Sequence, residues 1–307
     1  METVRRPPQR RSRIHSSEAR VAYICLIPAF LGLIFLTYVP LLGVLGISMT
    51  NWTGLATPKF VGISNYVKIF TTDPFIKDSI AVTIYFALLS VAGSMIYSLF
   101  IAILLNRKIP ARGFFRAVFY VPYVLPAVAV YVGWSWLYEA NFGFFNYLLS
   151  EMGLKKVLFI ADSSYVVPSL SLISVWLSGN LIVIFLAGLQ NVPRSYHEAA
   201  EMDGANSWNR FRHITLPGIS PIIFYNLLLS LIANLQVITP ALALTNGGPG
   251  NASRFMTYLM YDQAFVNYKL GYASATTFII FAILACFTIL LFKTSGAWIF
   301  SEGGDDK

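Results

Sequence analysis

The stretch SYHEAAEMDGANSWNRFRHITLP, residues 195–217, is a polar island between two long apolar runs of the chain. Ser195 is followed three residues later by Glu198, the pattern of a capping box that starts a helix. Gly204 comes after an aspartate and can take the left-handed conformation that ends a helix. Asn206, or the serine after it, can then cap a second helix. We therefore expect a helix, a tight turn and a second helix, held at a membrane surface.

A rigid helical projection at a membrane surface suits docking into another protein. Its two consecutive alanines add no bulk, so a partner can approach closely, and its charged residues can form ion pairs with that partner. The same pattern also fits an amphipathic surface helix that only orders a loop between two spans. The candidate contact residues are Glu198, Ala199, Ala200, Asp203, Gly204 and Arg210.

Charged residues are scarce and clustered along the chain. They make up 12% of its 307 residues, well below the roughly 25% of soluble domains. A transmembrane helix needs about 20 apolar residues. The longest uncharged interval, 213–253, could hold two spans, but its end is rich in Gly, Pro, Asn and Ser and indicates an external loop. We therefore predict one span in each of six intervals: 21–58, 79–106, 117–138, 163–193, 213–253 and 270–292.

The basic residues indicate the orientation of the chain. With the N-terminus placed inside the cell, 15 of the 22 lysines and arginines lie on the inner side and 7 on the outer side. This bias follows the positive-inside rule, so both termini and the 195–217 stretch are predicted to be cytoplasmic. The same distribution accounts for the net charge of +8, and we therefore expect no nucleic-acid partner.

Three motifs resemble those of one family of membrane proteins. The sequence EAAxxDGA at 198–205, with Phe, Ile, Leu and Pro at 211, 214, 216 and 217, resembles the EAA loop of permease subunits in bacterial binding-protein-dependent ABC importers. The sequences TNGGPG at 245–250 and FVGxxNY at 60–66 resemble segments of the carbohydrate-uptake branch of that family, the maltose and glycerol-phosphate type. The resemblance covers residues 20–293.

This resemblance implies a set of partners. In the family, the EAA loop is a coupling helix that sits in a groove of an ABC ATPase, and a dimer of that ATPase uses ATP and magnesium. A second related permease completes the pathway, and an extracytoplasmic solute-binding protein delivers the carbohydrate. The chain itself has no GxxxxGK[ST] phosphate loop, so we do not expect it to be an enzyme. Its two cysteines fall in apolar spans without metal-ligand spacing, and we expect no metal or cofactor in this chain.

Polar and aromatic side chains inside the spans are candidates for the substrate path. Amides are costly in a bilayer unless they pair or line water, and both amides and aromatic rings suit a sugar. Interfacial anchoring of the aromatics and hydrogen bonding between helices are the alternatives. Pro122 and Pro126 are expected to kink the third span, and Pro240 to open the fifth. The path candidates are Tyr131, Trp134, Trp176, Asn180, Asn226, Asn234 and Gln236.

These observations predict an all-α integral membrane protein with six transmembrane helices and a cytoplasmic coupling helix between the fourth and fifth. The expected function is that of the permease subunit of an ABC importer that moves a carbohydrate or related polyol through the bacterial cell (inner) membrane. The alternatives are an ABC permease for a non-sugar solute such as glycerol phosphate, and a channel or scaffold without an ATPase. The expected parts are a basic tail, the first span, an external loop, the permease core and a cytoplasmic tail, at 1–20, 21–48, 49–78, 79–293 and 294–307.

Overall fold

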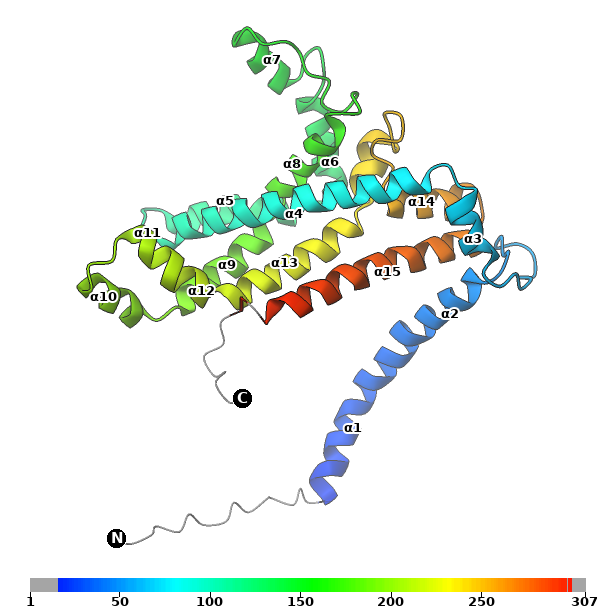
Figure 1. Ribbon diagram of the computed structural model, residues 1–307, viewed down its shortest axis with the longest axis horizontal. Helices are drawn as coiled ribbons and strands as arrows, with labels where there is room; N and C mark the ends of the chain where they lie inside the picture. Colours follow the sequence, from blue (N-terminus) through cyan, green and yellow to red (C-terminus); the bar gives the residue numbers. More distant parts are fainter. Residues whose placement is uncertain (1–15, 297, 300–307) are drawn as a thin grey trace.

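The computed structural model describes residues 16–296, 298 and 299 (Figure 1). Apart from one isolated bridge between Thr50 and Phe60, all regular structure in these residues is helical, so the all-α prediction is confirmed for them. Most of the expected basic tail and the acidic end of the chain lie outside the described residues.

Helices connected by short π-helical segments make up the chain. The π segments are η1 (Ile34–Tyr38), η2 (Phe211–Thr215), η3 (Ala241–Thr245) and η4 (Asp262–Val266). The helices are α1 (Ser16–Leu33), α2 (Val39–Ser48), α3 (Ser64–Thr71), α4 (Ile76–Asn106), α5 (Arg112–Val124), α6 (Ala127–Leu137), α7 (Phe144–Glu151), α8 (Val166–Trp176), α9 (Gly179–Asn191), α10 (Arg194–Met202), α11 (Ser207–Arg210), α12 (Leu216–Gly218), α13 (Ser220–Leu235), α14 (Met256–Tyr261) and α15 (Leu270–Ser295).

Helix α4 is the centre of the bundle, with α8, α9 and α13 packed against it. Its buried face carries serines, whose small size lets neighbouring helices approach closely. The hydroxyl of Ser98 lies 2.9 Å from that of Ser178, at the junction of α8 and α9. On α9, a Cβ atom added to Gly188 would lie 2.7 Å from Ile222 of α13. The bundle is therefore held by close contacts between small residues, as is typical of helices packed in lipid.

The first span stands apart from this bundle. Its helix α1–η1–α2 is continuous, and Val21–Ser48 is long and apolar enough to cross a membrane, with 0% of its apolar window buried. In Figure 1, α1 leans away from the other helices while α2 packs against α15. The side chain of Asn65 on α3 fastens the end of α2, since its amide donates to the carbonyls of Ser48 and Thr50 at 2.8 and 2.7 Å. The first span is thus attached at one end only.

Three of the expected spans are broken by sharp bends. The pair α5–α6 bends by 99°, the pair α8–α9 by 49°, and α13 turns by 66° from the helical residues 207–218. The first break falls at Pro126, which caps α6, whereas helix α5 continues through Pro122. Among the described residues, three helices could cross a membrane, or up to six if each bent pair is one span.

The fifth span opens earlier than expected. We predicted that Pro240 would open the helix, but α13 already ends at Leu235, and Val237 and Ile238 have no regular structure. Pro240 instead caps the next segment, η3. The predicted break is present, and it fits an effect of Pro240, which has no N–H to bond the carbonyl of Gln236, the residue that follows α13.

Candidate coupling surface and translocation path

Residues 194–218 form a helical hairpin at one end of the bundle, next to the C-terminal end of α4 (Figure 1). Its first helix, α10, begins at Arg194 with Pro193 at the N-cap position and without a side-chain cap. The expected capping box between Ser195 and Glu198 is therefore wrong. Pro193 fixes the backbone where the helix begins, and Ser195 lies within the helix instead of before it.

The turn of the hairpin is closed by glycine, as expected. Gly204 has φ +80°, a conformation that favours glycine. The N–H of Gly204 donates to the carbonyl of Glu201 at 3.0 Å, and the N–H of Ala205 donates to the carbonyl of Ala200 at 2.9 Å. These two bonds satisfy carbonyls at the end of α10 and fix the direction in which the chain leaves it.

Two side-chain contacts fix the second half of the hairpin. The side chain of Asn206 accepts a hydrogen bond from the N–H of Asn209 at 2.8 Å, which confirms that Asn206 caps the second helix. Across the turn, a guanidinium nitrogen of Arg210 lies 2.7 Å from a carboxylate oxygen of Glu201. Arg210, expected to face a partner, is thus paired within the hairpin itself.

The remaining predicted contact residues lie on α10 and in the turn that follows it. Glu198, Ala199 and Asp203 are exposed, and Ala200 is half-buried. With Pro217 and Ile214, the two alanines and Asp203 line a cleft of about 830 Å³ beside α10. Among the residues of α10, none is buried, so another surface can approach this helix.

A second cavity, of about 510 Å³, lies between α4, α6, α8, α9 and α13. It brings together three of the predicted path residues, Tyr131, Asn180 and Asn234. The amide nitrogen of Asn234 donates to the carbonyl of Ser230 at 2.8 Å. We call this space, with Tyr131, Asn180 and Asn234 in its lining, the polar cavity.

The polar cavity is located where the helices break. Its lining includes Leu125 at the α5–α6 bend, Leu177 and Ser178 at the α8–α9 bend, and Val237 just beyond the end of α13. Interrupted helices that meet inside a membrane protein are a usual setting for a substrate site. Every residue that lines the cavity is uncharged, and the polar ones carry hydroxyl or amide groups.

The other four predicted path residues lie elsewhere. Trp134 and Trp176 are ring partners with centroids 5.6 Å apart, and Trp134 belongs to an aromatic cluster outside the cavity lining. Asn226 is buried and donates to the carbonyl of Leu181 at 3.2 Å, which links α13 to α9. Gln236 is exposed at the end of α13. For Trp134, Trp176 and Asn226, the alternatives of aromatic packing and helix-to-helix bonding fit their placement better.

Sequence reasoning missed several hydroxyl groups of the polar cavity. Tyr123, Ser174 and Ser230 line it beside the predicted residues. Ser230 lies four residues before Asn234 on α13, so the two share one helix face. This spacing was the signal that could have identified Ser230.

The FVGxxNY and TNGGPG motifs both build loops at the other end of the bundle. Besides the Asn65 bonds, the hydroxyl of Tyr66 lies 2.8 Å from that of Ser48, so the first motif holds α3 to α2. In the second motif, the hydroxyl of Ser253 donates to the carbonyl of Gly248 at 2.6 Å. A Cβ atom added to Gly247, which has φ +82°, would lie 3.0 Å from the ring of Tyr258.

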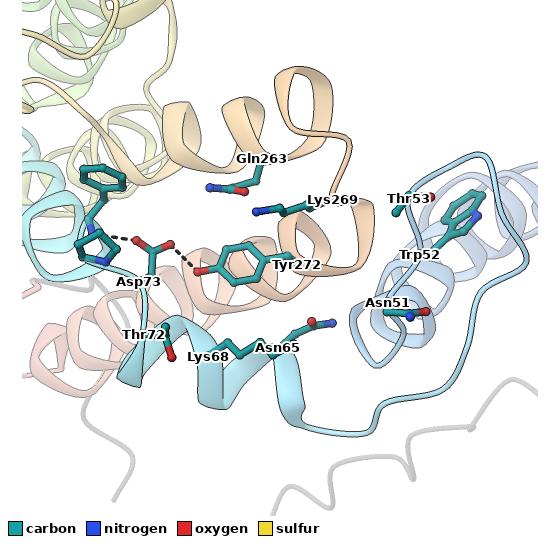
Figure 2. Close-up of a pocket in the computed structure, with 12 residues that line it drawn as sticks. Asn51, Trp52, Thr53, Asn65, Lys68, Thr72, Asp73, Gln263, Lys269 and Tyr272 are labelled. Carbon is teal, nitrogen blue, oxygen red and sulfur yellow. Dashed lines mark hydrogen bonds between the residues drawn. The ribbon is translucent and has the colours of Figure 1, made fainter.

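At the same end, Figure 2 shows a pocket of about 490 Å³ between α3, η4 and the start of α15. Lys68 and Lys269 approach it from opposite walls, and the carboxylate of Asp73 accepts hydrogen bonds from the hydroxyl of Tyr272 and, at 2.8 Å, from the N–H of Phe75. The pocket adjoins the point where the first span is fastened. None of its residues was predicted as a site residue.

Helix α7 and the residues around it project away from the bundle in Figure 1. The amide of Asn146 ties this projection together, since it donates to the carbonyl of Val157 at 2.9 Å and accepts from the N–H of the same residue at 2.8 Å. The N–H of Phe142, and then that of Asn141, donate to the Glu139 carboxylate and lower its pKa below the ordinary value. Exposed rings of Phe142 and Tyr147 make this projection a suitable contact surface.

Comparison with known proteins gives one consistent result. The profile of a family described as binding-protein-dependent transport system inner membrane component matches residues 94–294. The chain is 34% identical to a probable ABC transporter permease protein, YesP, of Bacillus subtilis, covering 97% of each chain. It is 30% identical to the trehalose/maltose transport system permease protein MalF of Thermococcus litoralis, covering 92% of this chain and 96% of that one.

Two further similarities concern another relative and the fold. The chain is 34% identical to the multiple sugar-binding transport system permease protein MsmF of Streptococcus mutans, covering 88% of this chain and 93% of that one. The fold is similar to that of a chain in the crystal structure of a bacterial ABC transporter involved in import of the acidic polysaccharide alginate. That chain has a TM-score of 0.77 and 20% sequence identity, with 92% of this chain and 96% of that chain covered.

Proposed function

Because the chain belongs to the family of inner membrane components of binding-protein-dependent transport systems, we propose that it forms part of the carbohydrate pathway of an ATP-driven importer. Relatives named for trehalose and maltose and for multiple sugars support a carbohydrate substrate. The family is one of membrane permeases and not of ATPases, so the energy comes from another subunit.

The polar cavity is the observation that carries this proposal. Hydroxyl and amide groups, together with the rings of Tyr123 and Tyr131, line it, and no charged side chain does. A neutral polyhydroxy solute can exchange hydrogen bonds with such a lining and stack its C–H faces on the rings, without an ion that would need a counter-charge. The cavity therefore suits a sugar better than a phosphate ester.

The membrane topology follows from the broken spans and the charge bias. Counting α5–α6 and α8–α9 as one span each, and α13 as a span that starts after the helical residues 207–218 of the hairpin, gives six, with the basic residues enriched on the side of the helical hairpin. Both termini and the hairpin are then cytoplasmic. In this arrangement 1–20 and 294–307 are tails, 21–48 is the first span, 49–78 is an external loop, and 79–293 is the permease core.

The helical hairpin is the proposed docking element for an ABC ATPase dimer. Its exposed face offers Glu198, Ala199, Ala200 and Asp203 to a groove, and Gly204 sets the turn. At the start of α13, buried Ile219 joins the two parts, since its N–H donates to the carbonyl of Thr215 in the hairpin at 3.0 Å and its carbonyl accepts from the N–H of Ile223 in α13 at 2.9 Å. A movement of the hairpin therefore passes into α13, whose Asn234 lines the polar cavity.

Two further partners fit surfaces of this chain. The uncovered first span suits packing against a second, related permease, because nothing in the described part of the chain covers its apolar window. The projection around α7, with its exposed rings, suits an extracytoplasmic solute-binding protein. A protein of similar fold supports this idea, since the structure of a bacterial alginate ABC transporter was determined in complex with an alginate pentasaccharide-bound periplasmic protein.

The alternatives are weaker on specific grounds. Import of glycerol phosphate would call for a cation beside the phosphate, and the polar cavity has none in its lining. A channel or scaffold without an ATPase would not need a hairpin with an exposed, fixed docking face joined to a cavity-lining helix.

The test is the exchange of Asn234 for alanine in the assembled importer, reconstituted in liposomes with its binding protein and a panel of neutral oligosaccharides. We expect about fivefold slower uptake, because one hydrogen bond is worth about 1 kcal/mol, with an unchanged amount of bound ATPase. Gln236→Ala is the matched control, an exposed amide on the same helix end, outside the cavity. Equal uptake by the two variants, or transport of glycerol phosphate alone, would reject the proposed path.

A further inference from the structure

A groove of about 740 Å³ runs along the inner half of α4, on the side where α11 and η2 lie. Its wall on α4 is formed by Ile96, Leu99, Phe100 and Ile103, and the groove ends at Arg107. Trp208, Phe211 and Thr215 line the opposite side. We call this space the inner groove.

The apolar part of the inner groove is exposed. Ile96 is 72% exposed and Phe100 is 58% exposed, so both side chains need an apolar neighbour that the described part of this chain does not supply. From Ile96 to Arg107 the helix rises by about 16 Å, at 1.5 Å per residue. That length is about half of the roughly 30 Å hydrocarbon core, which is the depth of one leaflet.

The polar end of the inner groove is basic. Arg107 caps α4 and has no ion pair among the described residues, while His197, Arg210 and Ser207 line the same end. Trp208 is 64% exposed beside them, and exposed indoles at this depth anchor at the headgroup level of a membrane. No acidic side chain lines the groove, although Glu201 pairs with Arg210 behind it.

We propose that the inner groove binds an anionic glycerophospholipid of the cytoplasmic leaflet. One acyl chain lies along Ile96, Phe100 and Ile103, and the phosphate is held by Arg107, with hydrogen bonds available from Ser207 and His197. Basic pockets between helices at the cytoplasmic face are a recognised setting for such headgroups. The apolar wall is as long as one leaflet is deep, and an acyl chain can cover it. A free phosphate has no such chain, so the wall favours a lipid.

This inference rests on the proposed orientation, and its test is independent of transport. The assembled importer is purified, stripped of lipid in mild detergent, and given phosphatidylglycerol or phosphatidylcholine with identical acyl chains. Native mass spectrometry then counts the retained lipids and measures their apparent affinity. We expect phosphatidylglycerol to be retained in preference to phosphatidylcholine, and not to be displaced by millimolar inorganic phosphate.

Paired variants locate the site. Arg107→Gln should weaken phosphatidylglycerol binding about fivefold, the equivalent of about 1 kcal/mol for one basic residue near anionic lipid. Lys108→Gln is the control, since the neighbouring cation is equally exposed but does not line the groove, and it should leave binding unchanged. A photoreactive phosphatidylglycerol should label α4 or the Trp208 segment.

Three outcomes would overturn the proposal. Equal retention of the two lipids would indicate ordinary annular lipid, and equal loss in the two variants would indicate a diffuse charge effect. If the cysteine of a Phe100→Cys variant crosslinked to the second permease, that partner and not a lipid would occupy the groove. Sugar uptake by the wild-type importer tests the proposed function separately. A failure of the lipid-binding proposal can therefore be distinguished from a failure of the proposed transport function.

Discussion

The helical hairpin and the polar cavity lie at opposite ends of α13 and are built in different ways. The hairpin is local, since its Glu201–Arg210 ion pair and its Asn206 cap join residues at most nine positions apart. The cavity gathers side chains from Ser94 on α4 to Asn234 on α13, and it exists only because several helices break where they meet. The proposed docking element is therefore contained in a short stretch of sequence, whereas the proposed path requires the whole bundle.

The largest effect should come from the turn of the hairpin. Gly204→Val places a β-branched residue at φ +80°, where left-handed backbone costs about 1–2 kcal/mol even for an unbranched residue. The C-terminal end of α10 then loses its closing bonds and its direction. We expect sugar uptake in reconstituted importer to fall at least tenfold, with normal insertion of the chain into the membrane.

Gly153→Val is the matched control for this change. Gly153 follows α7 with φ +72°, and like Gly204 it has no atom within 4 Å of an added Cβ. Its backbone strain is the same, but it lies at the other end of the molecule. Because the projection around α7 is the proposed contact of the binding protein, the two variants are compared by the amount of ATPase that co-purifies with them. Gly153→Val should retain the ATPase, and equal loss of ATPase in both variants would indicate general destabilisation and not coupling.

A smaller effect should come from the helix break that shapes the cavity. At Gly179 an added Cβ would lie 2.7 Å from the carbonyl oxygen of Phe119 and 3.1 Å from the Cα of Tyr120, and backbone atoms cannot move aside as side chains do. Overpacking of this kind costs about 1–3 kcal/mol. Gly179→Ala should lower the melting temperature of the purified importer by several degrees and slow uptake about fivefold.

Gly133→Ala provides the comparison, because this helical glycine on α6 has nothing within 4 Å of an added Cβ. Alanine favours a helix by about 0.5–1 kcal/mol over glycine, so this variant should melt at the same temperature or higher. Wild-type uptake by Gly179→Ala would mean that α5 and α9 separate easily, and that the bend does not shape the path.

The smallest effect should come from the ion pair of the hairpin. The Glu201 side chain is 69% exposed, and exposed pairs contribute only about 0.2–1 kcal/mol. Glu201→Gln should change uptake less than twofold, and high salt should remove even that difference. A tenfold loss would instead place Glu201 in contact with the ATPase.

The sequence was most informative where structure is local. The left-handed Gly204 and the Asn206 cap were predicted from residue type and spacing alone, because each depends on neighbours within a few positions. The capping box at Ser195 was wrong for an equally local reason, since Pro193 takes the N-cap position. Pro126 likewise located the bend between α5 and α6.

The cavity was predictable only in part. Of the predicted path residues, Tyr131, Asn180 and Asn234 line it, whereas Asn226 carries an amide like the last two but bonds the α9 backbone. The type of side chain does not predict whether an amide lines the cavity or bonds a neighbouring helix. Packing decides which face of each helix points to the cavity. The break at Leu177 could not be predicted from a proline, because none lies there, and α13 ends before Pro240 is reached.

The attachment of α13 to the hairpin through Ile219 also has a mechanical meaning. Its 16 residues make a rod about 24 Å long at 1.5 Å per residue. A tilt of about 5° at the Ile219 end displaces the Asn234 end by about 2 Å, which is enough to break a hydrogen bond, since these bonds weaken beyond about 3.2 Å. The helix acts as a lever arm, and a rotation too small to repack the bundle can release a bound sugar.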